Sequence, residues 1–259
     1  MARPVSIGVQ AATMIDCPAR VPLIIFAKRC KINVKDPVDL DAVRLGRLIH
    51  AAFERAMTAV DEAGKLGDGA AATGALERAI TTVLPDLDAT AISAHASSLS
   101  ATITAAVKTQ PAAQVAHEQR VSVLLVPSAR VSGRIDTIID GEHGWIVVER
   151  KTGERRPWHA RQVQLYADMV AATHPGQRVA RLELWYSGRE PGPVVVPIAH
   201  GSRLGTLRGD AVKGITLTSQ AARQLVHAKC KGCPREDCGV KRLAWLPAFE
   251  EGGNVGKPT

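Results

Sequence analysis

The stretch Val131–Gly153, VSGRIDTIIDGEHGWIVVERKTG, decides the fold of this chain of 259 residues. Val and Ile are concentrated in two segments, 131–139 and 145–150, and the turn-forming residues DGEHG lie between them. This pattern predicts two successive β-strands joined by a tight turn. Each predicted strand carries one acidic residue, Asp136 in the first and Glu149 near the end of the second.

These carboxylates predict a metal site. A carboxylate within an apolar strand is costly to bury unless it is paired or bound to a metal. If the strands pair, Asp136 and Glu149 face one point and can hold a hard cation such as Mg²⁺ or Mn²⁺. Lys151 lies two residues after Glu149, on the same strand face, where it can orient a water or stabilise charge on a phosphate. Taken alone, however, a Glu-x-Lys pair is far more often a solvated pair at a sheet edge.

The order of elements along the rest of the chain predicts an α/β or α+β fold with a mixed sheet. We expect α/β, with the central sheet flanked by helices, in one domain over residues 1–259. The Ala-rich segment 63–116 is expected to form a variable helical subdomain, and 247–259 a flexible tail. Further strands are predicted over 120–126, 179–187 and 194–198, and helices over 39–61, 157–172, 207–212 and 217–229.

Four short segments in this order resemble the PD-(D/E)XK nuclease superfamily in its RecB-type branch. They are LGRLIH at 45–50, GRID at 133–136, ERKTG at 149–153 and QVQLY at 162–166. The resemblance implies a restriction-endonuclease-like core. It also implies that His50, Asp136 and Glu149 bind the metal and that Lys151 acts on the water.

The last segment, QVQLY, contributes two further residues. Gln162 and Tyr166 are four residues apart on a predicted helix, so both can face one site. The resemblance makes them catalytic residues that position the metal or the DNA, whereas a buried polar pair beside the sheet is the alternative.

A second group of metal-binding residues lies near the C-terminus. Cys230, Cys233 and Cys238 form a Cys-x2-Cys-x4-Cys pattern, which requires a fourth ligand. His227 would complete a zinc knuckle. Alternatively, Cys17 or Cys30 would complete an iron–sulfur cluster.

The sequence also resembles the RecB-type nucleases that carry a 4Fe-4S cluster, including the AddB nuclease domain and the CRISPR-associated RecB-like exonucleases. In these families the N-terminal cysteine is commonly followed by proline and a basic residue. Cys17, followed by Pro18 and then Arg20, fits this pattern better than Cys30. The resemblance therefore implies a cluster on Cys17, Cys230, Cys233 and Cys238 that joins the N- and C-terminal segments.

Charge favours nucleic acid as the partner. The chain has 33 Lys and Arg residues against 25 Asp and Glu residues, a net charge of +8. Basic residues are frequent around the predicted strands, and Trp158 could stack on a base; a solvated basic loop with Trp158 packed on the sheet explains the pattern equally well. The candidate DNA contacts are Arg134, Arg150, Arg155, Arg156, Arg161 and Trp158.

The predicted function is a metal-dependent DNA exonuclease that hydrolyses phosphodiester bonds of single-stranded DNA or DNA ends, in recombination, repair or CRISPR spacer acquisition. No Walker A loop is present, so unwinding would come from a helicase partner. The alternatives are a DNA-end-binding accessory subunit, for example beside a CRISPR integrase, and a zinc-knuckle DNA-binding protein. No apolar run reaches the roughly 18 residues of a membrane span and no secretory signal is visible, so we expect a cytoplasmic protein without membrane contact.

Overall fold

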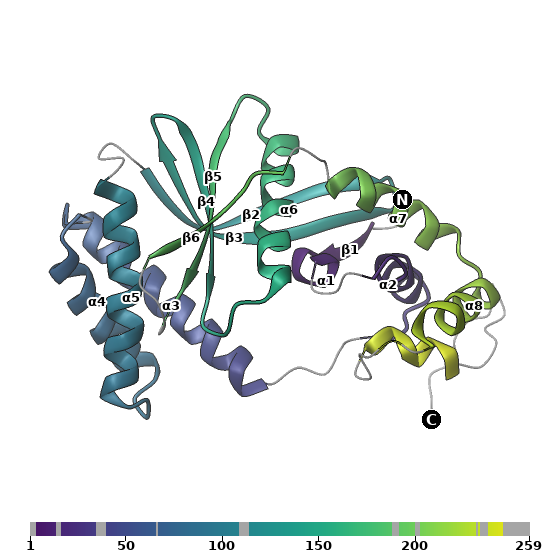
Figure 1. Cartoon of the computed structure of the whole chain (residues 1–259), viewed down its shortest axis with the longest axis horizontal. Coiled ribbons are helices and arrows are strands. Elements are labelled where there is room, and N and C mark those ends of the chain that lie inside the picture. Colours follow the sequence, from purple (N-terminus) through teal and green to yellow (C-terminus); the bar gives the residue numbers. More distant parts are fainter. Residues whose placement is uncertain are drawn as a thin grey trace. The chain divides into compact units, whose positions relative to one another are not determined.

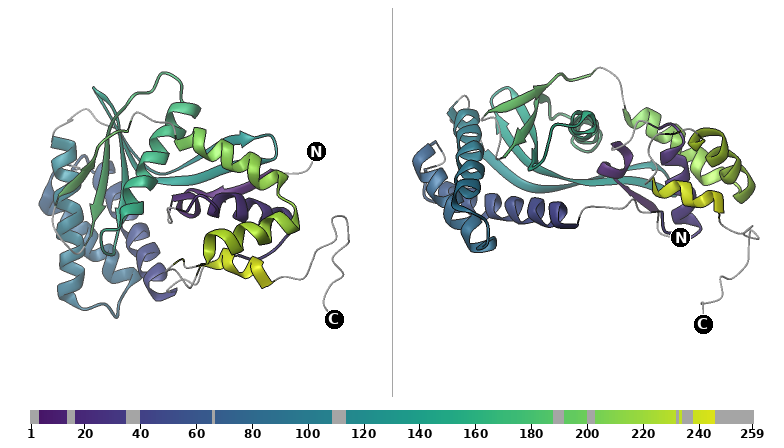
Figure 2. Two further views of the ribbon diagram at one scale, coloured as in Figure 1. Left: turned by 45° about the vertical axis from the view of Figure 1, so that its right-hand side comes forward. Right: turned by 60° about the horizontal axis from the view of Figure 1, so that its bottom comes forward.

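The computed structural model describes residues 4–13, 17–34, 40–65, 67–108, 114–187, 192–199, 203–231, 233 and 238–245. The chain divides into two compact units (Figures 1 and 2). The larger unit comprises residues 39–122 and 133–201, and the smaller unit comprises residues 1–38, 123–132 and 202–259. Each is described by itself below.

A mixed sheet forms the centre of the larger unit, as the Val- and Ile-rich segments predict. Two of its strands lie only partly in this unit: residues 114–122 of β2 (Gln114–Val126) and residues 133–141 of β3 (Ala129–Gly141). The others are β4 (Gly144–Lys151), β5 (Val179–Tyr186) and β6 (Pro193–Val196). β3 pairs with β4 and β5 with β6 antiparallel, whereas β4 and β5 run parallel.

The β3–β4 hairpin depends on one glycine. Gly144 has a φ of +111°, and a Cβ there would lie 2.4 Å from the backbone oxygen of Arg178. Only glycine fits this position.

Three helices cover one face of this sheet: α3 (Leu40–Glu62), α4 (Gly69–Val83) and α5 (Ala89–Lys108). Their apolar residues form a core with Ile146 and Val148 of β4 and with Trp185 of β5. Because side chains alternate along a strand, residues 145, 147, 149 and 151 of β4 face the other side. There α6 (Pro157–Thr173) packs on β4 and β5, with Pro157 at its first turn (Figure 1).

The smaller unit contains the N-terminal and C-terminal segments. β1 (Val5–Gly8) runs parallel to β3 over residues 129–132, and α1 (Val9–Thr13) and α2 (Arg20–Arg29) follow it. α7 (Arg203–Thr216) packs tightly on α2, since a Cβ at Gly214 would lie 2.6 Å from Pro22 O. α8 (Ser219–Cys230) and the 3-10 helix η1 (Gly239–Trp245) complete the unit.

The predicted helices and strands are confirmed, with some boundaries corrected. β2 begins at Gln114, so the end of the expected helical segment 63–116 is strand. α7 is longer than the predicted helix over 207–212. Asp39, the expected cap of α3, and the tail 247–259 lie outside the described residues. Among the described helices, none combines the length and the apolar composition needed to cross a membrane.

Candidate metal centre

Two neighbouring strands bring the carboxylates of Asp136 and Glu149 together. β3 pairs with β4 so that Thr137 lies opposite Val148, and Asp136 and Glu149 are the adjoining residues. Both side chains are buried, with 6% and 3% of their surface exposed. The backbone N–H of Arg150 donates a 2.7 Å hydrogen bond to Asp136 Oδ2, which fixes this carboxylate beside β4.

His50 reaches the same point from α3. Its Nδ1 atom lies 3.5 Å from Asp136 Oδ1. Gly46, four residues earlier on α3, lies against the loop that follows β4, because a Cβ at Gly46 would be 3.4 Å from Thr152 Oγ1. The absence of a side chain at Gly46 therefore allows α3 to lie close enough for His50 to meet Asp136.

Glu118 is a member of the site that sequence reasoning missed. One ligand atom each from His50, Glu118 and Asp136 lie within 4.8 Å of one another. Glu118 lies on β2 with a φ of 55°, a backbone conformation that residues other than glycine rarely adopt. Such outliers concentrate at functional sites. The sequence carries no signal for it, because the alternation of Val and Leu that predicts the strand begins only after Arg120.

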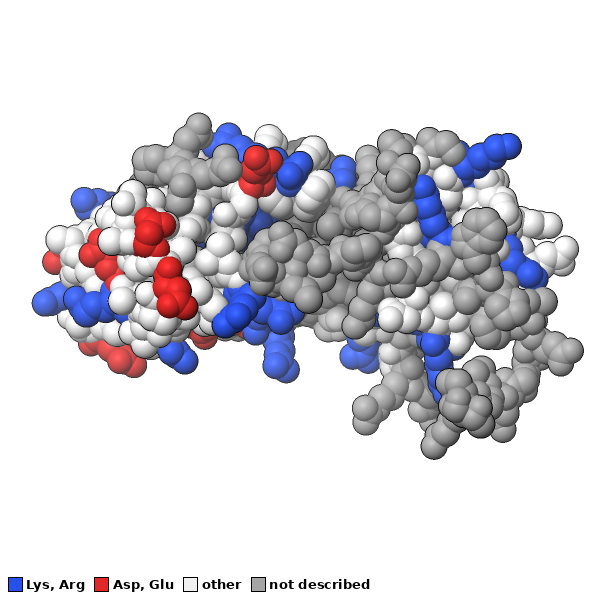
Figure 3. Space-filling model, turned by 90° about the horizontal axis from the view of Figure 1, so that it is seen from below, with Lys and Arg blue, Asp and Glu red and all other residues white. Residues whose placement is uncertain are grey.

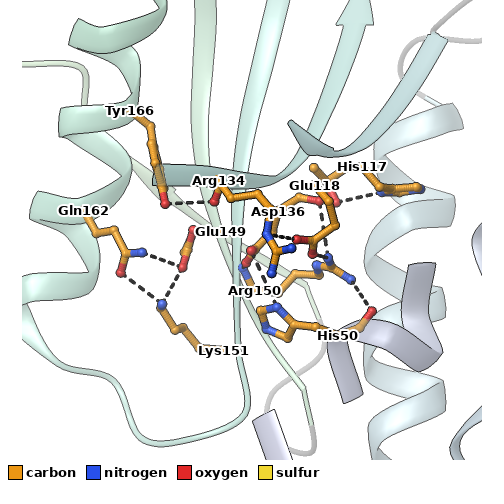
Figure 4. A network of polar contacts seen from close by, with 11 residues as sticks. His50, His117, Glu118, Arg134, Asp136, Glu149, Arg150, Lys151, Gln162 and Tyr166 are labelled. Carbon is orange, nitrogen blue, oxygen red and sulfur yellow. Dashed lines mark hydrogen bonds and ion pairs between the residues drawn. The ribbon is translucent and has the colours of Figure 1, made fainter. Parts of the chain in front are cut away.

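Lys151, Glu149 and Gln162 form a second cluster beside this group (Figure 4). Lys151 Nζ donates to Glu149 Oε1 at 2.5 Å and to Gln162 Oε1 at 3.0 Å. Gln162 Nε2 donates to the same glutamate oxygen at 2.8 Å. One helical turn later, Tyr166 donates its hydroxyl hydrogen to Arg134 O at 2.8 Å. All the predicted residues of the ERKTG and QVQLY segments thus lie around the two carboxylates.

The two central carboxyl groups have opposite pKa shifts. Burial acts to raise the pKa of Asp136, but the charges of His50, Arg150 and Lys151 outweigh burial and hold that pKa well below its usual range. For Glu149, burial and then the charge of Asp136 raise the pKa to about 7, against the opposing effect of Lys151. Two adjacent carboxylates repel, so only one of them ionises readily without a cation.

One buried atom indicates that the site fits a cation. Glu149 Oε2 is buried and has no hydrogen-bond partner among the described residues. A buried carboxylate oxygen without a partner is costly, and a cation would satisfy it. Opposite ligands of Mg²⁺ lie about 4 Å apart. The His50, Glu118 and Asp136 ligand atoms all lie within 4.8 Å of one another, so the residues can fit a divalent cation.

Comparison with known proteins agrees with this geometry. A family model for the PD-(D/E)XK nuclease superfamily matches residues 10–239. The chain belongs to this superfamily. Membership implies metal-dependent nuclease activity with DNA as the substrate.

Seven chains of solved structures also resemble this PD-(D/E)XK nuclease. One, described as "Crystal structure of SSO0001", has a TM-score of 0.37 and 15% sequence identity, and the match covers 90% of this chain and 88% of that chain. No curated protein matches the chain.

The predicted DNA contacts of the nuclease differ in exposure. Arg134 and Arg156 have side chains that are 61% and 51% exposed, and Trp158 is half-buried. Arg156 lies 5.8 Å from the Trp158 ring, and Arg155 lies 5.5 Å from the Tyr186 ring. On the face drawn in Figure 3, Asp and Glu gather over the α3–α5 helices, whereas Lys and Arg occur over both units.

The structure corrects the prediction that Arg150 contacts DNA. It was a candidate DNA contact from its position in the ERKTG segment, but only 2% of its surface is exposed. β4 directs its side chain toward the covered face, away from Glu149 and Lys151. It therefore does not reach DNA in this conformation.

The cysteines lie in the smaller unit, and none forms a disulfide. Burial, and then the charges of Cys238, Cys17 and Cys233, raise the pKa of Cys230, so each of these three cysteines lies close enough to Cys230 to act on its thiol. Cys30 is not among the main causes of this shift. Sulfur atoms around one tetrahedral zinc ion lie about 3.8 Å apart. Among the described residues, no three cysteine sulfurs lie within 4.8 Å of one another.

Proposed function

We propose that the chain is a DNA exonuclease of the RecB-type branch, in which one cation is held by His50, Asp136 and Glu149, with Glu118 as a further ligand. The observation that carries this proposal is the buried, unpartnered Oε2 atom of Glu149 beside the group of His50, Glu118 and Asp136. The three carboxylates suit Mg²⁺ or Mn²⁺, and the imidazole favours Mn²⁺ over Mg²⁺. Bound there, the cation supplies Lewis-acid activation of the phosphate and lowers the pKa of a water.

Lys151 then acts on the reacting phosphate. Two of its three ammonium hydrogens point to Glu149 Oε1 and Gln162 Oε1, so the third can donate to the attacking water or to a phosphate oxygen. The water oxygen forms a bond to phosphorus as the bond from phosphorus to the leaving sugar oxygen breaks. The water proton passes to solvent, and the leaving oxygen takes a proton from solvent. Throughout, Lys151 stabilises the negative charge that develops on the phosphate.

Gln162 and Tyr166 hold this arrangement in place. Gln162 uses its amide oxygen for Lys151 and its amide nitrogen for Glu149, so it orients both groups at once. Burial, the largest cause, raises the pKa of Tyr166, so its hydroxyl remains a neutral donor to Arg134 O. That contact ties α6 to β3, the strand that carries Asp136.

Arg134, Arg155, Arg156 and Trp158 are proposed to bind the DNA backbone and one base. Arg134 lies within the GRID segment, and the other three residues follow the ERKTG segment in sequence. The side chains of Arg134 and Arg156 are more than half exposed, and Arg155 is exposed as well. Phosphate contacts carry no base specificity, which suits an exonuclease acting on single-stranded DNA or DNA ends. Recombination, repair and CRISPR spacer acquisition are the proposed settings, with a helicase or an integrase as the partner.

A 4Fe-4S cluster on Cys17, Cys230, Cys233 and Cys238 is the second part of the proposal. It is supported by the Cys-x2-Cys-x4-Cys pattern and by the position of Cys230, on whose thiol the charges of Cys238, Cys17 and Cys233 act. Arg20, which is buried, donates from Nη1 to Cys238 Sγ at 3.3 Å and would compensate the negative charge of such a cluster.

The nuclease proposal is tested on linear and on circular single-stranded DNA with Mn²⁺, with Mg²⁺ and with EDTA. We expect degradation of the linear strand alone, dependence on the cation, and loss of activity in Asp136→Asn. Cleavage of the circle would replace the exonuclease with an endonuclease. DNA binding without any cleavage would favour the accessory subunit instead.

The cluster proposal is tested separately, by anaerobic purification with iron analysis and a visible spectrum. Broad absorbance near about 400 nm with stoichiometric iron is the expected result. A colourless protein that contains zinc would overturn the cluster.

A further inference from the structure

Arg150 occupies the middle position of the Glu149-Arg150-Lys151 segment and lies within the larger unit, with 2% of its surface exposed. A buried guanidinium is costly unless its hydrogen-bonding groups are paired. The hydrogen-bond acceptors of its two terminal nitrogens all belong to the candidate metal centre, whereas its Nε atom has no hydrogen-bond partner among the described residues.

Each of the three residues of the metal group is in contact with Arg150 (Figure 4). Its Nη2 atom donates to Glu118 Oε1 at 3.0 Å and to the backbone oxygen of Asp136 at 3.3 Å. Its Nη1 atom donates to the backbone oxygen of His50 at 3.4 Å. One side chain thus joins α3, β2 and β3, the three elements that supply these ligands.

A fourth contact fixes the plane of the guanidinium. The Arg150 Cζ atom lies 4.3 Å from the centre of the Phe53 ring. Phe53 is fully buried and follows His50 by three residues, so both lie on adjacent turns of α3. The ring and the backbone oxygen of His50 therefore hold the guanidinium from the same helix.

We propose that Arg150 is a positioning residue that sets the spacing of His50, Glu118 and Asp136 and thereby the affinity of the site for its cation. This inference rests on the proposed metal centre. Arg150 would not touch the cation or the DNA. Its charge offsets the repulsion between the carboxylates of Glu118 and Asp136. Arg150 holds Glu118 through Oε1, whereas Glu118 Oε2 pairs with Arg134 Nε.

The planar guanidinium group of arginine, with its fixed arrangement of N–H donors, is essential to this role. An ammonium group could replace the charge, but it could not span Glu118, Asp136 and His50 with two nitrogens while lying flat on Phe53. Lys is therefore not a conservative replacement at this position, and Arg150→Lys separates the geometry of the side chain from its charge.

The test measures Mn²⁺ binding by electron paramagnetic resonance of the full-length protein without DNA. Arg150→Lys and Arg150→Met are compared with the wild type, and Arg181→Lys is the matched control. Arg181 forms an ion pair with the buried Glu183 on β5, outside the metal group. We expect the dissociation constant for Mn²⁺ to rise about 10- to 100-fold in both Arg150 variants and to stay unchanged in the control.

A second measurement separates positioning from a general loss of structure. Cleavage by Arg150→Lys should recover toward the wild-type rate as Mn²⁺ approaches saturation, whereas an unfolded fraction would not recover. If Arg150→Met does not fold, Phe53→Leu keeps the arginine but removes the ring beneath it, and we expect a smaller weakening of Mn²⁺ binding.

The results distinguish failure of the positioning role from failure of the metal centre. Wild-type affinity for Mn²⁺ in folded Arg150→Lys and Arg150→Met would overturn the positioning role and leave the metal centre intact. A wild-type protein that binds no Mn²⁺ would overturn the metal centre and this inference with it.

Discussion

Lys151 is the residue whose role in the reaction is most directly testable. Its Nζ atom is held by Glu149 and Gln162, so the ammonium group is fixed before any substrate arrives. We predict that Lys151→Met lowers the single-turnover cleavage rate about 10²- to 10³-fold, the usual loss when one preorganised donor is removed. Lys213→Ala, which removes a lysine that is 72% exposed, is the control. Undiminished cleavage by Lys151→Met would show that this lysine is not part of the reaction.

The raised pKa of Glu149 predicts how metal binding depends on pH. Its pKa is raised to about 7 in the metal-free protein, whereas Asp136 stays ionised because its pKa is lowered. Since the cation requires the ionised carboxylate, binding releases a proton from Glu149 below its pKa. We therefore predict that affinity for Mn²⁺ rises by up to about tenfold per pH unit below about pH 7 and levels off above it.

The variant Glu149→Gln tests whether Glu149 is the source of this pH dependence. Glu149→Gln should bind Mn²⁺ more weakly and lose the part of the pH dependence that Glu149 contributes. A profile that is equally steep in both proteins would assign the proton to another group.

Single residues also mark where sequence reasoning about the site succeeds and where it fails. Asp136, Glu149 and Lys151 are found because strand alternation places them near one point, whatever the rest of the fold does. Glu118 cannot be found this way, because its position depends on an irregular φ within β2. Arg150 was misjudged because adjacency in sequence suggested exposure, whereas alternation along β4 buries it.

At the level of elements, segments with a regular hydrophobic pattern were predicted correctly. The bounds of the other elements depend on packing between elements. β3, β4 and α6 have strong periodicity and clear turn signals, and their observed bounds lie within two residues of the prediction. α7 was predicted too short because three glycines weaken its helical pattern. Its length depends instead on contact with α2, which no local pattern encodes.

The glycines of α7 give a prediction at this level. Gly214 faces α2, and a Cβ there would lie 2.7 Å from Ile25 Cβ, so Gly214→Ala should push the two helices apart. We expect a loss of about 1–3 kcal/mol in the free energy of unfolding. Gly209→Ala, in the same helix with nothing within 4 Å, should instead stabilise by about 0.5–1 kcal/mol, because alanine favours helix. Urea unfolding of both variants measures this, and equal effects would contradict the proposed packing.

At the level of the whole molecule, the family match over residues 10–239 spans both compact units. The candidate metal centre belongs to the larger unit, and the cysteines belong to the smaller one. The smaller unit is also where chain segments from near both termini meet, since Arg20 of α2 donates to Cys238 Sγ and α2 packs on η1. A cluster there would close a loop containing most of the chain.

Such a closure predicts a large effect on stability. Cross-links that close long loops remove the most conformational entropy from the unfolded chain, about 4 kcal/mol or more in the entropic account. We therefore predict that Cys17→Ser, purified without oxygen, loses its iron and melts roughly 10 °C below the wild type.

Cys30→Ser is the matched control for this prediction. Cys30 follows the last residue of α2, and its backbone N–H donates to Phe26 O, but its thiol is not among the main causes of the raised pKa of Cys230. Its serine variant should retain both iron and melting temperature. If Cys30→Ser loses the iron while Cys17→Ser keeps it, Cys30 is the fourth ligand. If both keep the iron, the three C-terminal cysteines bind it without the N-terminal segment, and no loop through most of the chain is closed.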